Sequence, residues 1–252
     1  MTLAVALSAR PAAHPVAFAS VPHATACQDC GTRANGLCAA IKAENLARFS
    51  PAHAPQSVEA GKTFINEGDP ATHFFTVTEG SVKLFKLLSD GRRAVTGFLF
   101  PGDIFGYSDA DAYNYSAEAM TPVRLCRFPR RQLGHLYADF PGLESRLLKL
   151  VSRELATAQD LMVLLGRKTA HERLASFLLG LAGRQGVKGG WLELPMTRAD
   201  IADYLGLTTE TVSRVFTVLK ASGCVALAGG KVRVSDADAL AELADGVLAE
   251  GA

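Results

Sequence analysis

A chain of 252 residues is long enough for one large domain, or for two domains of ordinary size with a connector. With 48% hydrophobic and 20% charged residues, the composition is typical of a globular chain with a full core, and it excludes global disorder. The formal net charge of +1 gives no sign of a nucleic-acid, membrane or acidic partner, so any such signal has to be local.

The N-terminal residues 1–26 have some features of a signal peptide. A secretory signal needs an uninterrupted apolar run, but Arg10, Pro11 and Pro15 interrupt this one soon after it starts. We therefore interpret residues 1–26 as a disordered tail. No other stretch approaches the roughly 18 apolar residues of a membrane span, so we expect no membrane contact and a cytoplasmic setting in which thiols stay reduced.

Three cysteines gather in the next segment, residues 27–50, which ends in a helix predicted at residues 40–49. Cys27, Cys30 and Cys38 follow the pattern C-x2-C-x7-C, and Cys126 lies far downstream in a predicted strand. Clustered thiols in a reducing compartment more often bind metal than form disulfides. Four thiolates suit zinc or an iron–sulfur cluster, and the softness of sulfur does not separate the two, although structural zinc usually has two short cysteine pairs.

The remaining positions of the cysteine pattern predict how the site is built. The twofold period of a strand places Cys126 on the face opposite Leu125, where it would tie the N-terminal loop to the β-domain. Cys224, beside a helix end, is predicted to be a small buried core residue and not a ligand.

Short apolar runs interrupted by glycines fill residues 51–138. The turn at Asp90 and Gly91, between two alternating runs, is a strong hairpin signal. The regular spacing predicts a β-roll, a jelly-roll sandwich or barrel of short antiparallel strands. The glycines that punctuate it, about ten residues apart, are Gly61, Gly68, Gly80, Gly91, Gly102 and Gly106.

Residues 139–167 have the periodicity of a long helix, because apolar side chains recur at spacings of three and four. The stripe is close to a heptad, so the helix packs either on its own β-domain or on a parallel or antiparallel helix of a second subunit. Five positions of the stripe are candidate contacts in a homodimer: Leu148, Val151, Leu155, Ala158 and Met162.

Residues 168–245 have the pattern of a winged helix-turn-helix domain. Thr197 has Asp200 three positions later, which resembles a capping box and predicts a helix start. That helix ends at Gly206, and the apolar positions on either side of the glycine allow a second helix to pack on the first. A helix pair that packs in the core without touching DNA is the alternative. Two predicted strands around Gly229 and Gly230 form a hairpin, the wing, that can reach phosphate.

The second of these helices carries the candidate DNA contacts, Thr209, Glu210, Ser213 and Arg214, on its outer side. Arg can bind guanine O6 and N7, and Glu can accept from cytosine N4, each good pair giving roughly 1–3 kcal/mol of discrimination. A surface salt bridge between Glu210 and Arg214 is the alternative. From residue 168 to 234 the chain has nine Lys or Arg against five Asp or Glu, so this region is locally basic.

The order of these features resembles the CRP/FNR superfamily of bacterial transcription regulators. The segments CQDC, DLMVLL, HERLA, TRADIADYLGLT and ETVSR are similar to its oxygen-responsive FNR branch, over about residues 27–243. The resemblance implies an α+β chain with a cyclic-nucleotide-binding-like β-roll, a dimerisation helix and a C-terminal winged helix-turn-helix. It also implies a 4Fe-4S cluster on Cys27, Cys30, Cys38 and Cys126, and binding to a TTGAT-N4-ATCAA palindrome by Glu210, Ser213 and Arg214. Loss of the cluster in oxygen would then weaken the dimer and its binding to DNA.

Three departures from family patterns qualify this implication. The x7 spacing between the second and third cysteines is longer than in the enterobacterial form. Ala158 stands where that form has an acidic residue, and since two alanines do not repel across a dimer, we hypothesise that dimerisation depends less on the cluster here. We do not expect a cyclic nucleotide to bind, because no Arg precedes Arg124 where a cyclic phosphate would need one.

The leading hypothesis is therefore a dimeric, DNA-binding, oxygen-sensing regulator that contacts RNA polymerase through exposed β-roll loops such as residues 89–93. A zinc site, a thiol switch, or a small-molecule-gated regulator of the same fold is an alternative. We do not expect an enzyme, because the chain has no nucleophile–base constellation and no phosphate loop.

Overall fold

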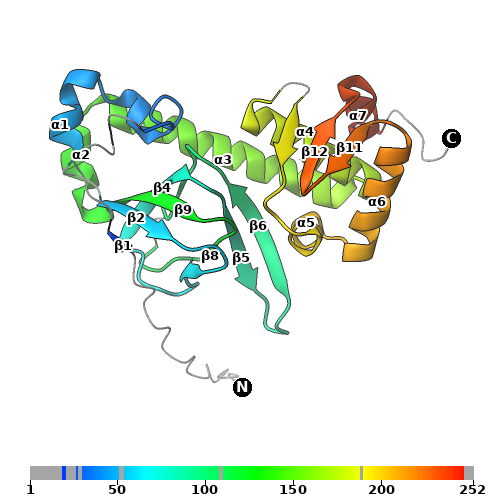
Figure 1. Cartoon of the computed structure of the whole chain (residues 1–252). Coiled ribbons are helices and arrows are strands. Elements are labelled where there is room, and N and C mark those ends of the chain that lie inside the picture. Colours follow the sequence, from blue (N-terminus) through cyan, green and yellow to red (C-terminus); the bar gives the residue numbers. More distant parts are fainter. Residues whose placement is uncertain are drawn as a thin grey trace, which may run out of the picture.

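The computed structural model describes residues 19–20, 27, 30–50, 54–107, 110–187 and 190–246. A β-sandwich, a long helix and a smaller domain of helices with a short sheet follow one another along the chain (Figure 1). The long helix α3 (Gly142–Arg167) runs along both folded parts and joins them. The predicted α+β fold is confirmed.

The β-sandwich consists of two antiparallel sheets. One has the order β1 (Ala19–Ser20), β2 (Ala54–Val58), β9 (Val123–Pro129), β4 (His73–Glu79), β7 (Ile104–Phe105). The other has the order β3 (Thr63–Ile65), β8 (Ser116–Ala119), β5 (Val82–Leu87), β6 (Arg93–Leu99). Apolar side chains from both sheets meet in one core that includes Val77, Val82, Leu99 and Leu125.

The glycines that predicted the strand spacing all have positive φ, as tight turns require. Gly80 shows why a side chain is excluded at one of them. A Cβ added there would lie 2.2 Å from the carbonyl oxygen of Pro122, so the turn after β4 depends on glycine.

The single helix predicted at residues 40–49 is wrong. The segment contains two 3-10 turns, Leu37–Ala40 and Ala43–Asn45, before one α-helical turn, α1 (Leu46–Phe49). Extended backbone at Ile41 and Lys42 interrupts the helix. In this arrangement Leu37, Ile41 and Phe49 are all buried in one core, together with Phe74 and Phe128 of the sandwich strands.

Two helices follow the sandwich, after a 3-10 turn at Arg130–Gln132: α2 (Leu133–Asp139) and α3. The N-terminal part of α3 is covered, because Leu143 and Leu147 pack in a core with Phe49, Phe74 and Phe128. This core lies between the cysteine-rich segment and the outer face of the β4 and β9 strands, the face opposite the sandwich core.

The C-terminal domain has the order of a winged helix-turn-helix. Its helices are α4 (Ala170–Gln185), α5 (Arg198–Leu205), α6 (Thr209–Ala221) and α7 (Ala237–Ala244). Its sheet has the order β10 (Trp191–Glu193), β12 (Lys231–Val234), β11 (Val225–Ala228). Both α4 and α5 start with complete capping boxes, the second being the predicted pair Thr197 and Asp200.

The predicted disordered tail, residues 1–26, falls outside the described residues except for Ala19–Ser20, which pairs with β2. The other predicted domain limits remain predictions. Within the described residues, none of the helices combines the length and the apolar character needed to cross a membrane.

Candidate functional site

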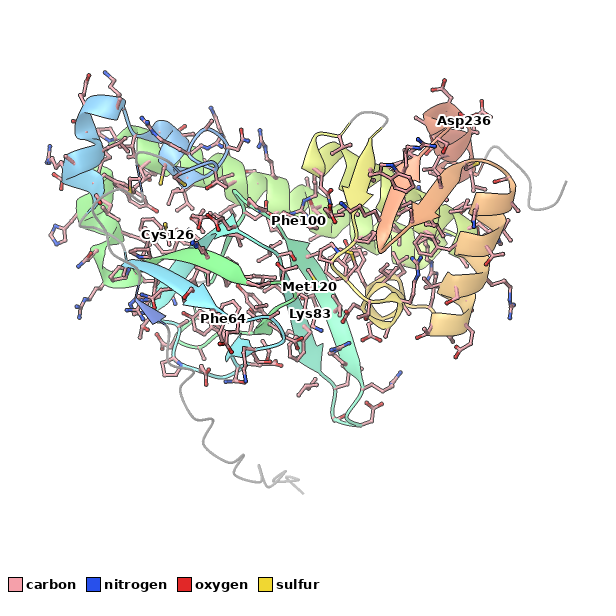
Figure 2. The ribbon with its side chains drawn as sticks, in the orientation of Figure 1. Phe64, Lys83, Phe100, Met120, Cys126 and Asp236 are labelled. Atoms are coloured by element: carbon pink, nitrogen blue, oxygen red, sulfur yellow. The ribbon has the colours of Figure 1, made fainter. Side chains whose placement is uncertain are left out.

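Four cysteines from two distant parts of the chain line one small cavity. Cys27, Cys30 and Cys38 come from the N-terminal segment, and Cys126 comes from β9, next to that segment in Figure 2. Cys126 packs with the outer core and Leu125 with the sandwich core, so the predicted opposition of their faces is confirmed. None of the five cysteines, all of which lie in the described ranges, forms a disulfide, and Cys224 is buried in the C-terminal core as predicted.

Burial raises the pKa values of three of these thiols, those of Cys27, Cys38 and Cys126, and keeps them protonated. It raises the pKa of Cys38 to about 12, with smaller contributions from Cys27 and Cys30. Burial also raises the pKa of Cys126 well above the ordinary thiol range, and that of Cys27 less, since a hydrogen bond with Ser50 opposes the shift. A metal centre held by these sulfurs would therefore have to displace protons.

Hydroxyl groups also line the cavity. The hydroxyl of Thr76 is buried, lines the cavity and has no hydrogen-bond partner among the described residues. Cys30 Sγ lies 3.2 Å from the hydroxyl of Thr32. In the part of the chain that the structure describes, no group of three or more His, Cys, Asp or Glu side chains is arranged to hold a single metal ion.

The loop between Cys30 and Cys38 contacts two other parts of the molecule. Arg146 on α3 donates from Nε to the carbonyl of Gly36 at 3.0 Å and from Nη2 to that of Asn35. Gly36 also packs on Gly102, where a Cβ on either glycine would touch the other segment's backbone. The cysteine loop is therefore fastened to α3 and to the sandwich.

The predicted DNA contacts all lie on the exposed side of α6. Thr209, Glu210, Ser213 and Arg214 are exposed, and the opposite side of the helix packs in the domain core. Hydrogen bonds from its own backbone N–H and from Thr208 lower the pKa of Glu210, so its carboxylate, which any glutamate has in ionised form at neutral pH, is stabilised further. The described residues show no ion pair between Glu210 and Arg214, so the salt-bridge alternative is not supported.

The predicted dimer contacts lie on an uncovered stripe of α3. Leu148, Leu155 and Met162 are 67%, 59% and 71% exposed, and Ala158 lies between the last two on the exposed side. Val151 is half-buried against its own chain's outer core. Leu165, 38% exposed, continues the same spacing and belongs with this set, although the prediction omitted it.

The comparisons with known proteins assign the family. Residues 172–243 match the Crp-like helix-turn-helix domain, and residues 55–140 match the cyclic nucleotide-binding domain. The nitrogen fixation regulation protein FixK of Bradyrhizobium diazoefficiens is 41% identical over 218 residues, covering 85% of this chain and 92% of that protein. The transcriptional activator protein FnrL of Cereibacter sphaeroides is 37% identical over 210 residues, covering 81% and 85%. The structure of FixK2 from Bradyrhizobium japonicum matches with a TM-score of 0.71 and 36% identity, over 76% of this chain and 96% of that one.

The chain belongs to the CRP/FNR family of transcription regulators. CRP/FNR proteins are DNA-binding regulators and not enzymes, so both expectations are confirmed. The expected partners are likewise those of the family: DNA, RNA polymerase and a second copy of the chain. The names of these relatives mention no iron–sulfur cluster. Membership of the CRP/FNR family therefore does not by itself assign a cluster to this chain.

A residue that the sequence reasoning missed lies beside the wing of this CRP/FNR chain. The guanidinium of Arg198, in the first turn of α5, stacks 3.3 Å from the centre of the Phe216 ring, and its Nη1 is buried without a hydrogen-bond partner. Arg198, Gly229, Gly230 and Lys231 line a groove of about 240 Å³. The signal in the sequence was the position of Arg198 directly after the cap Thr197. A positive side chain is unfavourable at the positive N-terminal end of a helix, so an arginine there is unusual.

Residues 55–140 keep the β-roll fold of the family. Within it, the hydroxyl of Tyr115 accepts a hydrogen bond from the backbone N–H of Gly106 at 2.6 Å. The turn proposed to contact RNA polymerase is exposed at residues 89–92. Arg93, the last residue of that predicted contact, points instead to α5, where it pairs with Asp200 and Asp203.

Proposed function

We propose that this chain is a dimeric, cytoplasmic, DNA-binding transcription regulator that senses oxygen through a 4Fe-4S cluster on Cys27, Cys30, Cys38 and Cys126. With the cluster bound, it recognises a TTGAT-N4-ATCAA palindrome through Glu210, Ser213 and Arg214. The observation that carries the proposal is that four thiols, three of them at the N-terminus and one on β9, line the same cavity.

The donor set fits an iron–sulfur cluster, because these clusters are held by four cysteine thiolates. The unpartnered Thr76 hydroxyl adds a hydrogen-bond donor that a cluster sulfide could accept. The cavity volume of about 20 Å³ leaves room for little more than a water molecule. The loop that carries Cys27, Cys30 and Cys38 therefore has to move outward when the cluster binds, and a bound cluster would supply a centre that oxygen can destroy.

Arg146 connects this loop to α3, the helix that carries the candidate dimer contacts. Arg146 holds the carbonyls of Asn35 and Gly36 between two of the candidate ligands. Because Arg146 lies on α3, a movement of the loop is passed directly to the helix that carries the candidate dimer contacts.

The position of the DNA-binding domain favours a parallel arrangement of the two α3 helices. Each helix-turn-helix follows the C-terminal end of its α3, and both recognition helices of a dimer have to reach half-sites one helical turn apart. Only parallel helices place both domains at the same end. In this arrangement the wing contacts phosphates, since its tip at Gly229 and Gly230 is exposed.

The test is to purify the protein without oxygen. We expect a brown protein with broad visible absorption that bleaches in air, with about four iron atoms and four sulfides per chain. The variant Cys126→Ala should lose the iron, and the matched control Cys224→Ala should keep it, because Cys224 lies in the other core. A colourless protein that holds zinc, or one without metal whose DNA binding follows thiol oxidation, would contradict the cluster and favour the zinc or thiol alternative.

A further inference from the structure

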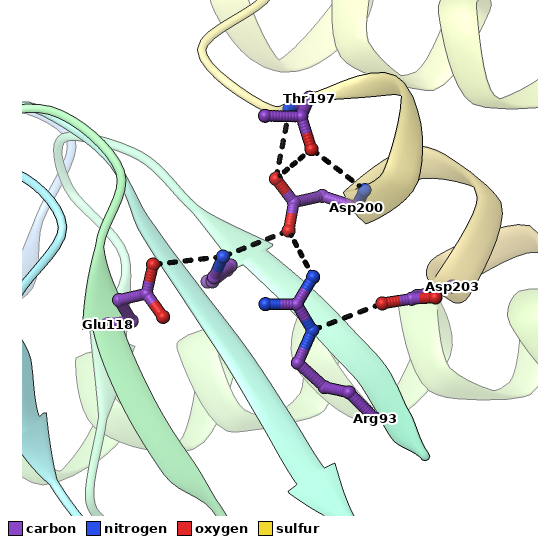
Figure 3. Close-up of polar contacts among 6 residues, drawn as sticks. Arg93, Glu118, Thr197, Asp200 and Asp203 are labelled. Atoms are coloured by element: carbon purple, nitrogen blue, oxygen red, sulfur yellow. Dashed lines mark hydrogen bonds and ion pairs between the residues drawn. The ribbon is translucent and has the colours of Figure 1, made fainter. Parts of the chain in front are cut away.

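The helix-turn-helix is held against the β-sandwich of its own chain by a network of charged side chains (Figure 3). The Nζ of Lys83, on β5, lies 2.9 Å from Asp200 Oδ1 on α5 and 2.9 Å from Glu118 Oε1 on β8. The guanidinium of Arg93, on β6, lies 2.9 Å from Asp200 Oδ1 and 3.1 Å from Asp203 Oδ2. Three strands and one helix therefore share one ionic cluster, in which Asp200 is 117 residues from Lys83 and 107 from Arg93 along the chain.

The centre of this network is buried. The side chains of Lys83 and Asp200 are 7% and 4% exposed. Burial alone would raise the pKa of Asp200, but hydrogen bonds from Thr197 and Lys83 outweigh it and hold the pKa below its usual value. A buried ion pair is costly to break and only favourable in good geometry, so it restricts the arrangement of the parts that it joins.

Apolar contacts surround the network, but they do not fix the angle between the C-terminal domain and the sandwich. Phe98 on β6 lies 5.1 Å from the ring of Tyr204 on α5 and 6.0 Å from that of Phe177 on α4. Apolar contact is non-directional, whereas charge-assisted hydrogen bonds require a particular alignment of donor and acceptor. Among the described residues, the directional contacts between these two parts of the chain are those of Lys83 and Arg93 with α5, and the ion pair of Asp103 with Arg184 on α4. Only the contacts of Lys83 and Arg93 hold the helix that packs against the recognition helix.

The network determines where the recognition helix lies without covering it. Asp200 is in the first turn of α5, and α5 and α6 pack through Ile201, Leu205 and Val212 across the turn at Gly206. In Figure 1, α5 faces β6, and α6 lies on the far side of the domain. The DNA contacts of α6 remain exposed while α5 is fixed.

We propose that Lys83, Arg93 and Asp200 are positioning residues for DNA binding, which set the angle of the recognition helix relative to α3. In a dimer this angle decides whether both recognition helices meet half-sites at the correct separation. The inference rests on the proposed function for the dimer and the palindrome. Asp200 has two roles in it, as the cap partner of Thr197 and as the acceptor for both cations.

The test compares Lys83→Met with Lys86→Met, a matched control on the same strand whose side chain is 43% exposed and 3.5 Å from Glu67. Each full-length protein is titrated with three duplexes: the TTGAT-N4-ATCAA palindrome, the same half-sites with a spacer two base pairs longer, and a single half-site. We expect K83M to bind the palindrome about tenfold more weakly, a typical size for coupling between two parts of a protein. Binding to the single half-site should change less than about twofold, so the preference for the correct spacer is reduced, and K86M should match the unmodified protein.

A purely structural role predicts a different result, namely equal losses on all three duplexes together with a lower melting temperature. That result, or an unchanged spacer preference in K83M, would overturn the inference. Tighter binding by K83M would also overturn it, since the network would then hold an inactive arrangement. If K83M does not fold, Arg93→Gln gives the same test, because Arg93 is only partly buried and Lys83 keeps its contacts in that variant. If the unmodified protein does not bind the palindrome, the proposed function fails, and the spacer comparison is then made on a palindrome selected from random DNA.

Discussion

At the scale of single residues, the proposed recognition of DNA depends on a few side chains of α6 that form hydrogen bonds with neighbouring residues. Hydrogen bonds at the start of α6 stabilise the carboxylate of Glu210 and lower its pKa. Ser213 donates to the carbonyl of Thr209 at 2.8 Å, which leaves its hydroxyl oxygen able to accept from DNA. Arg214 is exposed one turn after Glu210, so both can reach base edges from one side of the helix.

We predict that Arg214→Ala weakens binding to the palindrome by about 1–3 kcal/mol and relaxes selectivity at one base pair of each half-site. Lys220→Ala is the matched control, because Lys220 is also basic and exposed but lies in the last turn of α6. It should lower affinity for all duplexes equally, if at all. Titrations against a set of single-base variants measure both effects, and an R214A protein with unchanged selectivity would remove Arg214 from the interface.

Features that depend on residues close in the sequence could be predicted, and those that depend on distant residues could not. The capping pair of Thr197 and Asp200 and the turn at Gly206 were predictable, because their partners are within a few positions. Lys83 was not, since an alternating strand predicts a solvent-facing lysine and its partner Asp200 is 117 positions away. Asp200 was predicted only as a cap for the same reason.

At the scale of elements, α3 combines two surfaces. Its first turns are buried in the outer core through Leu143 and Leu147, and its later turns carry the uncovered stripe. The 3-4 spacing of the stripe was predictable from sequence. The break in the segment at residues 40–49 was not, because the segment packs against Phe74 and Phe128, which belong to strands distant in the sequence.

We predict that Ala158→Glu disrupts the dimer. In a parallel pair of α3 helices, two carboxylates about 6 Å apart in an effective dielectric of about 20 repel by about 3 kcal/mol. This corresponds to about a hundredfold weaker dimer. Ala156→Glu is the matched control, since Ala156 is exposed two residues away, off the apolar stripe. Sedimentation at several concentrations measures both variants, and equal dissociation constants would contradict the stripe as the interface.

At the scale of the whole molecule, two routes lead from the cysteine loop towards the DNA-binding domain. One is Arg146, from the loop carbonyls to α3. The other passes from Gly36 to Gly102, next to Asp103, which forms an ion pair with Arg184 on α4. The sequence could place Cys126 with the other thiols, but not these routes, because backbone carbonyls and glycine contacts leave no side-chain pattern.

We predict that Arg146→Ala uncouples the cysteine site from DNA. In the unmodified protein, the ratio of palindrome affinities before and after loss of the cluster in air should lie within the roughly 5–150-fold range typical of coupled sites. In R146A the loop can move without displacing α3, so the ratio should fall towards one while iron content stays unchanged. Lys149→Ala, exposed one turn further along α3, should keep the full ratio. Anaerobic titrations repeated after exposure to air give both affinities, and an R146A ratio equal to that of the unmodified protein would assign the coupling to the route through Asp103 and Arg184.

The dimer gives a second measurement on the same samples, because Ala158 places no charge on the stripe. We therefore expect protein without the cluster to remain partly dimeric at micromolar concentration, and a strictly monomeric form would show that the cluster also controls assembly.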